Sequence, residues 1–95
     1  MDLGSFPFEQ MKSLVLDAED LLEPIYQVFY RLGTEPQQHL EWGLVGKDWI
    51  LDFRDPEFPD LICRGRSDSP ENAFLDWRNN LPVYFQRRSM KLKET

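Results

Sequence analysis

HLEWGLVGKDWILDFR, at residues 39–54, is the stretch that decides the fold. Its centre is Gly46-Lys47, and glycine supplies the positive φ that a two-residue hairpin turn needs. Such a turn pairs Val45 with Asp48 and fixes the register of the two strands. Six apolar side chains then share one face of the ribbon in three cross-strand pairs: Leu44 with Trp49, Trp42 with Leu51, and Leu40 with Phe53. The sequence therefore predicts a hairpin over about residues 39–54, whose other face carries His39, Glu41, Asp52 and Arg54.

A short third strand is predicted to follow the hairpin. Residues 55–59 (DPEFP) contain two prolines and are typical of a stiff loop. The apolar run at about residues 60–64 (DLICR) has the composition of a strand. Residues 65–68 (GRSD) are typical of a turn. We therefore expect the third strand to end before Gly65.

An amphipathic helix is predicted over residues 7–22. Its apolar side chains recur every three or four positions, with charged residues between them. Ser5 or Phe6 would precede the helix, and Pro7 would lie in its first turn, where a missing N–H costs nothing. Pro24 then ends the helix, because its ring clashes with the preceding turn.

Residues 24–32 (PIYQVFYRL) fit two structures. The alternation of aromatic and β-branched residues favours a strand. Pro24 as an opening residue and Gly33 as a left-handed closing residue favour a helix. We favour the helix, and the strand remains the alternative.

A second amphipathic helix is predicted at about residues 70–80. Ser69 can accept a hydrogen bond from a free N–H, and Pro70 suits the first turn. The apolar stripe consists of Ala73, Phe74, Trp77 and Leu81. We expect the helix to end near Asn79-Asn80, because Pro82 follows.

Together these elements predict an α+β fold with one domain over residues 1–95. Its small antiparallel sheet consists of the hairpin at about 39–54 and the short strand at about 60–64. The sheet packs against the N-terminal amphipathic helix and the helix at about 70–80. The basic tail at about 86–95 is expected to fray.

Charge divides the chain into two unlike parts. Residues 1–60 hold thirteen Asp/Glu and four Lys/Arg, a net charge of −9, whereas residues 61–95 hold four and seven, a net charge of +3. The total of −6 argues against a protein that coats duplex nucleic acid, because phosphate binding needs clustered positive charge. With one cysteine, no apolar leader and no membrane span, the sequence indicates a cytoplasmic protein without a disulfide or a membrane contact.

Two candidate reactive sets can be weighed from the residue types. His39 and Cys63 are the only His and Cys residues, too few for a zinc site with four such ligands. They could form a nucleophile pair if the strands brought them together, but the apolar surroundings of Cys63 are typical of a buried small hydrophobe. We expect neither catalysis nor a cofactor here.

Four carboxylates crowd residues 52–60: Asp52, Asp55, Glu57 and Asp60. Such a cluster can hold Mg²⁺ or Ca²⁺ or supply an acid and a base, so a small hydrolase centred on Asp52, Asp55 and Asp60 is one option. The spacing matches no EF-hand loop. We interpret the cluster instead as a solvated rim that can dock on a partner with a basic surface.

Residues 58–61 (FPDL), followed by Gly65, Glu71 and Ala73, resemble the strand, turn and helix segment of HicB-type antitoxins. The resemblance is confined to this short part of the chain. The chain begins with a helical stretch where those antitoxins begin with a strand. We therefore carry over neither residue roles nor a function from it.

Our leading hypothesis is a non-enzymatic protein-binding module, such as an inhibitor, an antitoxin-like or immunity-like factor, or an assembly adaptor. Exposed aromatic side chains ringed by polar groups are common anchors of protein interfaces. The candidate contacts are Trp42, Trp49, Asp52, Asp55, Glu57, Phe58, Asp60 and Trp77. The aromatic members of this set could equally belong to the core. Homodimerisation through an uncovered sheet face or edge is compatible with the hypothesis.

The alternative hypothesis is a nucleic-acid-associated factor that uses the basic C-terminal third. Its contacts would be Arg64, Arg66, Arg87, Arg88, Lys91 and Lys93. These cations could instead neutralise the acidic part of the same fold, and we favour that explanation.

Overall fold

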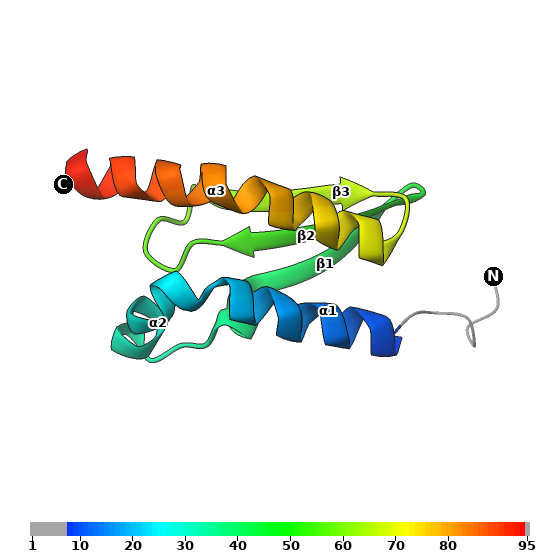
Figure 1. The fold of residues 1–95 in the computed structure, drawn as a ribbon, viewed down its shortest axis with the longest axis horizontal. Coiled ribbons are helices and arrows are strands. Elements are labelled where there is room, and N and C mark those ends of the chain that lie inside the picture. Colours follow the sequence, from blue (N-terminus) through cyan, green and yellow to red (C-terminus); the bar gives the residue numbers. More distant parts are fainter. Residues whose placement is uncertain (1–7, 95) are drawn as a thin grey trace.

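The protein is a two-layer α+β structure in which helices cover one face of a small sheet (Figure 1). The computed structural model describes residues 8–94, so the predicted helix start at Ser5, Phe6 and Pro7 lies outside the described residues. The elements are, in order, α1 (Phe8–Leu21), η2 (Glu23–Ile25), α2 (Tyr26–Leu32), η3 (Pro36–His39), β1 (Leu40–Val45), β2 (Asp48–Arg54), β3 (Ile62–Ser67) and α3 (Pro70–Glu94). The strands form one antiparallel sheet in the order β1-β2-β3.

The predicted hairpin register is confirmed. Val45 faces Asp48, and the three apolar pairs are those expected from the sequence. Gly46 has a φ of 62°, and Lys47 does not have a positive φ, which is the pattern of a type II′ turn. On the face toward the helices, the side chains of Leu51 and Phe53 are fully buried, but the Leu44 side chain near the turn is 50% exposed.

The helical interpretation of residues 24–32 is also confirmed. Pro24 lies in the short η2 turn between α1 and α2, and α2 ends at Gly33 in a left-handed conformation with a φ of 69°. The Thr34 N–H donates to the Phe29 carbonyl oxygen at 3.0 Å, which satisfies one of the last free carbonyls of the helix. Ile25 and Phe29 are buried, and Tyr26 and Tyr30 face outward.

The third strand lies further along the chain than expected, at Ile62–Ser67 rather than at about 60–64, and the predicted turn at residues 65–68 is wrong. β3 continues to Ser67, and Gly65 pairs with Leu51 in the middle of the strand. Gly65 is needed there for a different reason. A Cβ at Gly65 would lie 2.2 Å from the Ala73 carbonyl oxygen and 2.3 Å from the Trp77 backbone nitrogen. This glycine therefore allows β3 and α3 to approach each other closely.

The predicted end of the last helix near Asn79-Asn80 is wrong as well. Ser69 Oγ accepts from the Asn72 N–H at 3.2 Å as expected, but α3 runs through Pro82 to Glu94. Proline costs a helix interior about 3 kcal/mol. Contacts made beyond Pro82 offset this cost, because Tyr84 packs in the core and Arg88 pairs with Asp55. The tail that was expected to fray is helical through residue 94.

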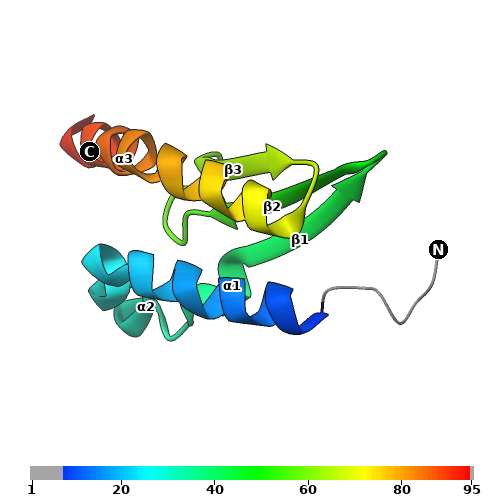
Figure 2. The ribbon, with the colours of Figure 1, turned by 45° about the vertical axis from the view of Figure 1, so that its right-hand side comes forward.

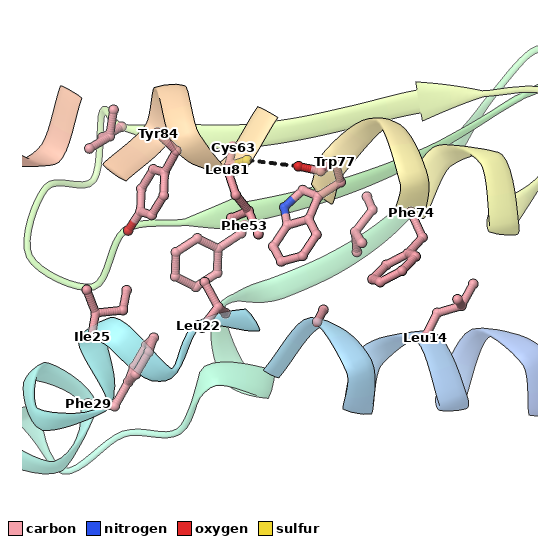
Figure 3. Close-up of a cluster of buried hydrophobic side chains, with 13 residues drawn as sticks. Leu14, Leu22, Ile25, Phe29, Phe53, Cys63, Phe74, Trp77, Leu81 and Tyr84 are labelled. Carbon is pink, nitrogen blue, oxygen red and sulfur yellow. Dashed lines mark hydrogen bonds between the residues drawn. The ribbon is translucent and has the colours of Figure 1, made fainter. Parts of the chain in front are cut away.

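The core lies between the sheet and the helices (Figure 3). Leu14 and Leu22 contribute from the α1 side, Phe53 from the sheet, and Trp77 and Leu81 from α3. Trp77 and Phe53 are the largest fully buried side chains. Burial of this size supplies most of the favourable free energy of folding. It also means that these aromatic side chains are structural.

Candidate partner-binding surface

A buried ion pair ties the loop after β2 to the second half of α3. The side chain of Asp55 has no exposed surface, and Arg88 Nη1 donates to its two oxygens at 2.9 and 2.8 Å. Asp55 also accepts from the hydroxyl of Tyr84 at 2.5 Å and from the backbone N–H groups of Glu57 and Phe58, both at 2.8 Å. These contacts occupy the acceptor positions of this carboxylate. Asp55 is therefore placed to anchor the loop rather than to accept a proton from a substrate.

Glu57 extends this anchor to α2. Its carboxylate accepts from Arg88 and, at 2.5 Å, from Arg31. Hydrogen bonds to Glu57 and Asp55 raise the pKa of Arg88 against the lowering effect of burial. Phe58 lies beneath two cations, with Arg88 Cζ 5.5 Å and Lys91 Nζ 5.7 Å from its ring centroid. The loop thus joins α2 and α3 through a charged cluster that is partly out of water.

The four carboxylates predicted as one solvated rim have different environments. Asp55 is buried, which corrects the expectation of an exposed rim. Asp52 accepts two hydrogen bonds from Arg64 at 2.7 and 2.8 Å on the outer face of the sheet. Asp60 is exposed and accepts from Lys91 at 2.8 Å. Each carboxylate of this cluster, Glu57 included, has a cation of the same chain beside it, so little negative charge is left for a partner.

The same ion pairs account for most of the basic C-terminal third. Arg64, Arg88 and Lys91 pair as above, and Arg66 pairs with Asp48 at 2.9 Å. Within residues 8–94, Arg87 and Lys93 have no carboxylate partner. The structure therefore supports the explanation that these cations mainly neutralise the acidic part of the fold.

The predicted aromatic contacts separate by burial. Trp77 is fully buried, so it belongs to the core and cannot meet a partner in this conformation. Trp42 and Phe58 are partly buried and pack against the core, and Trp49 is partly buried near the hairpin turn. The indole N–H groups of Trp42 and Trp77 are buried without a hydrogen-bond partner in the described residues. Of the predicted aromatic set, Trp42, Trp49 and Phe58 retain some accessible surface.

His39 and Cys63 do not form a reactive pair within the described residues. The His39 ring lies 5.6 Å from Phe29, and its Nε2 is 2.9 Å from Thr34 Oγ1. Burial lowers the pKa of His39, which Asp55 opposes in part, so the imidazole is neutral near pH 7. The Cys63 thiol donates instead to the Trp77 carbonyl oxygen, with Sγ 3.7 Å from that oxygen (Figure 3).

We expect the Cys63 thiol to be unreactive in the folded protein. Burial, with smaller contributions from Asp52 and Asp76, raises its pKa to about 12, so only about one thiol in 10⁴ is a thiolate at pH 8. Iodoacetamide should label Cys63 slowly in buffer and rapidly in urea. Equal labelling rates in the two conditions would contradict this placement.

A groove that the sequence did not predict lies between the end of α1, α2 and η3. Its volume is about 470 Å³, and it is lined by Glu19, Tyr26, Phe29, Tyr30, Thr34, Glu35, Pro36 and Gln37. We call it the tyrosine groove. Tyr30 is 91% exposed, and the Tyr26 hydroxyl donates to the Glu19 carbonyl oxygen at 2.6 Å. The spacing of Tyr26 and Tyr30 by four residues could have indicated a shared helix face, once the helix was chosen over the strand.

The tyrosine groove lies on a part of the molecule with a net negative charge. Residues 8–39 hold six Asp/Glu and two Lys/Arg, a net charge of −4, and Arg31 is already paired with Glu57. Burial raises the pKa of Glu19, and the neighbouring Glu35 and Asp20 raise it further. Within residues 8–94 neither Glu19 nor Glu35 has a cationic partner. This surface, unlike the loop at 52–60, therefore carries negative charge that the fold does not neutralise.

Metal binding and membrane spanning can both be assessed from the described residues. No group of three or more His, Cys, Asp or Glu side chains is placed to hold a metal ion in residues 8–94. None of the helices described combines the length and the apolar character needed to cross a bilayer.

Comparison with known proteins finds no matching family model, no similar curated protein and no similar solved structure. The segment resemblance at residues 58–73 is thus not supported by a family match.

Proposed function

We propose that this protein is a non-enzymatic acidic module that docks on a basic segment of another protein through the tyrosine groove. The observation that carries the proposal is the combination of two tyrosine rings, Tyr26 and Tyr30, with two carboxylates that have no cationic partner in residues 8–94. A Lys or Arg side chain fits such a groove, because the ring faces attract its cation and the carboxylates accept its hydrogen bonds.

The expected partner is still basic, as the sequence indicates, but it contacts the tyrosine groove instead of the loop at 52–60. The loop at 52–60 is occupied by Arg31, Arg64, Arg88 and Lys91 of this chain. A partner would have to displace these cations to use that loop. At the tyrosine groove a basic partner gains charge complementarity without displacing any ion pair of this chain.

A peptide titration followed by NMR tests the proposal. The probe is a blocked peptide of alternating arginine and glycine, and the largest shift changes are expected at the backbone amides of Tyr26, Tyr30 and Thr34. The double variant Glu19→Gln/Glu35→Gln should weaken binding about tenfold, because two carboxylates next to the bound cation become neutral.

The matched control is Glu9→Gln/Asp17→Asn, which removes two charges from exposed positions of α1 outside the groove. It should weaken binding by less than about twofold, because screened charges on the rim contribute little. Equal losses for the two double variants, or shift changes spread evenly over the surface, would contradict docking at the groove.

The nucleic-acid hypothesis makes a different prediction in the same experiment. Single-stranded DNA in place of the peptide should cause shift changes along α3, at Arg87 and Lys93, and binding should fall steeply with salt. Such a result without any peptide binding at the groove would reverse the preference between the two hypotheses.

A further inference from the structure

The two edges of the sheet differ in whether their outward-facing backbone groups are hydrogen-bonded. At the β3 edge, the Asn80 side chain donates to the Arg64 carbonyl oxygen at 2.8 Å. The Arg66 N–H donates to the Asp76 carboxylate at 3.0 Å. Both partners come from α3, so this helix occupies backbone groups that a further strand would need. The β3 edge is capped.

The β1 edge has no such cap. In a hairpin with a two-residue turn, Val45 and Asp48 exchange hydrogen bonds, and so do the pairs two and four residues away from them. The N–H and C=O groups of Trp42 and Leu44 therefore point away from β2. Within residues 8–94 these four groups have no hydrogen-bond partner. Figure 2 shows β1 at the margin of the sheet, with the hairpin turn extending beyond the helices.

The side chains of β1 do not protect this edge either. Natural proteins block open edges with proline, lysine, bulges or a covering element. Residues 40–45 (LEWGLV) contain neither proline nor lysine, and Glu41 is their only charged residue. Leu44 and Val45 are 50% and 54% exposed, one on each face of the strand. An edge strand with these features can pair with a further strand.

From these features we infer that β1 accepts an extended segment of the basic partner as a fourth strand. This inference rests on the proposed function for the chemistry of the partner, and it adds how the partner binds. Main-chain hydrogen bonds to Trp42 and Leu44 provide attachment, as in other cases of strand addition. An apolar residue of the added strand packs beside Leu44, and a basic residue lies next to Glu41 on the other face.

Charge selects this occupant over a second copy of the chain. Two copies would each bring a net charge of −6, and their repulsion opposes edge-to-edge pairing. Glu41 has no cationic partner in residues 8–94, and it lines a hollow of about 230 Å³ on the outer face together with His39, Arg54 and Asp52, which is paired with Arg64. A Lys or Arg side chain from the added strand can pair with the Glu41 carboxylate, whereas a second copy of β1 brings only another Glu41 as its charged residue.

Amide hydrogen exchange tests the inference directly. The probe is a short blocked peptide in which valine alternates with lysine. Without it, the amides of Trp42 and Leu44 should exchange quickly, and those of Gly43 and Val45 slowly, because the latter two donate to β2. At saturating peptide, exchange at Trp42 and Leu44 should slow at least tenfold. Unchanged exchange at these two amides would overturn the inference.

Two changes isolate the backbone contact. Leu44→Pro removes an N–H that faces the edge and leaves the β1–β2 bonds in place, so it should abolish peptide binding, whereas Leu44→Ala should retain it. If Leu44→Pro does not fold, a peptide N-methylated at alternate residues makes the same test, because it lacks the donors. Binding that survives both changes would overturn strand addition.

Glu41→Lys tests the choice of a basic occupant. It should weaken the valine–lysine peptide about tenfold and favour a valine–glutamate peptide. Protection of Trp42 and Leu44 that rises with protein concentration in the absence of peptide would instead indicate a second copy on the edge. Glu19→Gln/Glu35→Gln should leave the exchange protection unchanged, so failure at the edge is distinguishable from failure of docking at the tyrosine groove.

Discussion

Asp55→Asn is expected to lower the free energy of unfolding by about 3 kcal/mol, because it removes the more deeply buried of the two counterions of the Arg88 guanidinium and leaves only Glu57. Only 5% of the Arg88 side chain is exposed, and the side chain of Asp55 is not exposed at all. Asparagine has nearly the same shape, so the change removes charge rather than volume. Urea unfolding followed by circular dichroism measures the loss.

Asp52→Asn is the matched control for the buried pair. Asp52 also binds an arginine through two hydrogen bonds, but the Arg64 side chain is 57% exposed. Exposed pairs contribute less than about 1 kcal/mol, so this variant should be only slightly destabilised. If the two variants lose the same amount, burial of the Asp55–Arg88 pair does not determine its contribution.

A double variant separates the pair from its surroundings. Arg88→Met alone leaves a buried carboxylate that still accepts from Tyr84 and two backbone N–H groups. Combining it with Asp55→Asn removes both charges, so the double variant should lose clearly less than the sum of the single losses. Additive losses would mean that the two side chains do not stabilise each other.

Local sequence signals predicted the elements whose contacts are close in the chain. Gly46 determined the hairpin register, and Gly33 marked the end of α2 correctly, whereas Pro24 lies in η2, two residues before α2 begins at Tyr26. In each case the deciding interaction joins residues only a few positions apart. The antiparallel sheet packed against two helices followed from these elements together.

The errors at Pro82 and Asp55 concern contacts that are distant in sequence. Pro82 does not end α3, because Arg88 and Tyr84 beyond it are held by Asp55, about thirty residues earlier. Asp55 looked exposed because it lies between charged and proline residues, and nothing local revealed its partners. The tyrosine groove was missed for a different reason, since Glu35 and Tyr26 are close in sequence but come together only when η3 folds back beside α2.

Gly65→Ala is expected to cost about 3 kcal/mol or more, because the added methyl group has no space between β3 and α3. The new Cβ would meet the Ala73 carbonyl oxygen at 2.2 Å and the Trp77 nitrogen at 2.3 Å. Both are backbone atoms, so no side-chain rotation relieves the overlap. The helix must move away from the strand, which loosens the packing of Trp77. Thermal and urea unfolding should both show the loss.

Gly43→Ala is the matched control for Gly65→Ala. Gly43 is also a glycine inside a strand, but a Cβ there would have only Ile50 Cβ within reach, at 4.0 Å. Alanine at this position should change stability by less than about 1 kcal/mol, since it costs no packing and reduces the entropy of the unfolded chain. Both glycines lack positive φ, so backbone strain cannot explain a difference between them. A large loss at Gly65 with little change at Gly43 therefore measures the close approach of helix and strand, whereas similar losses would assign the effect to glycine in a strand as such.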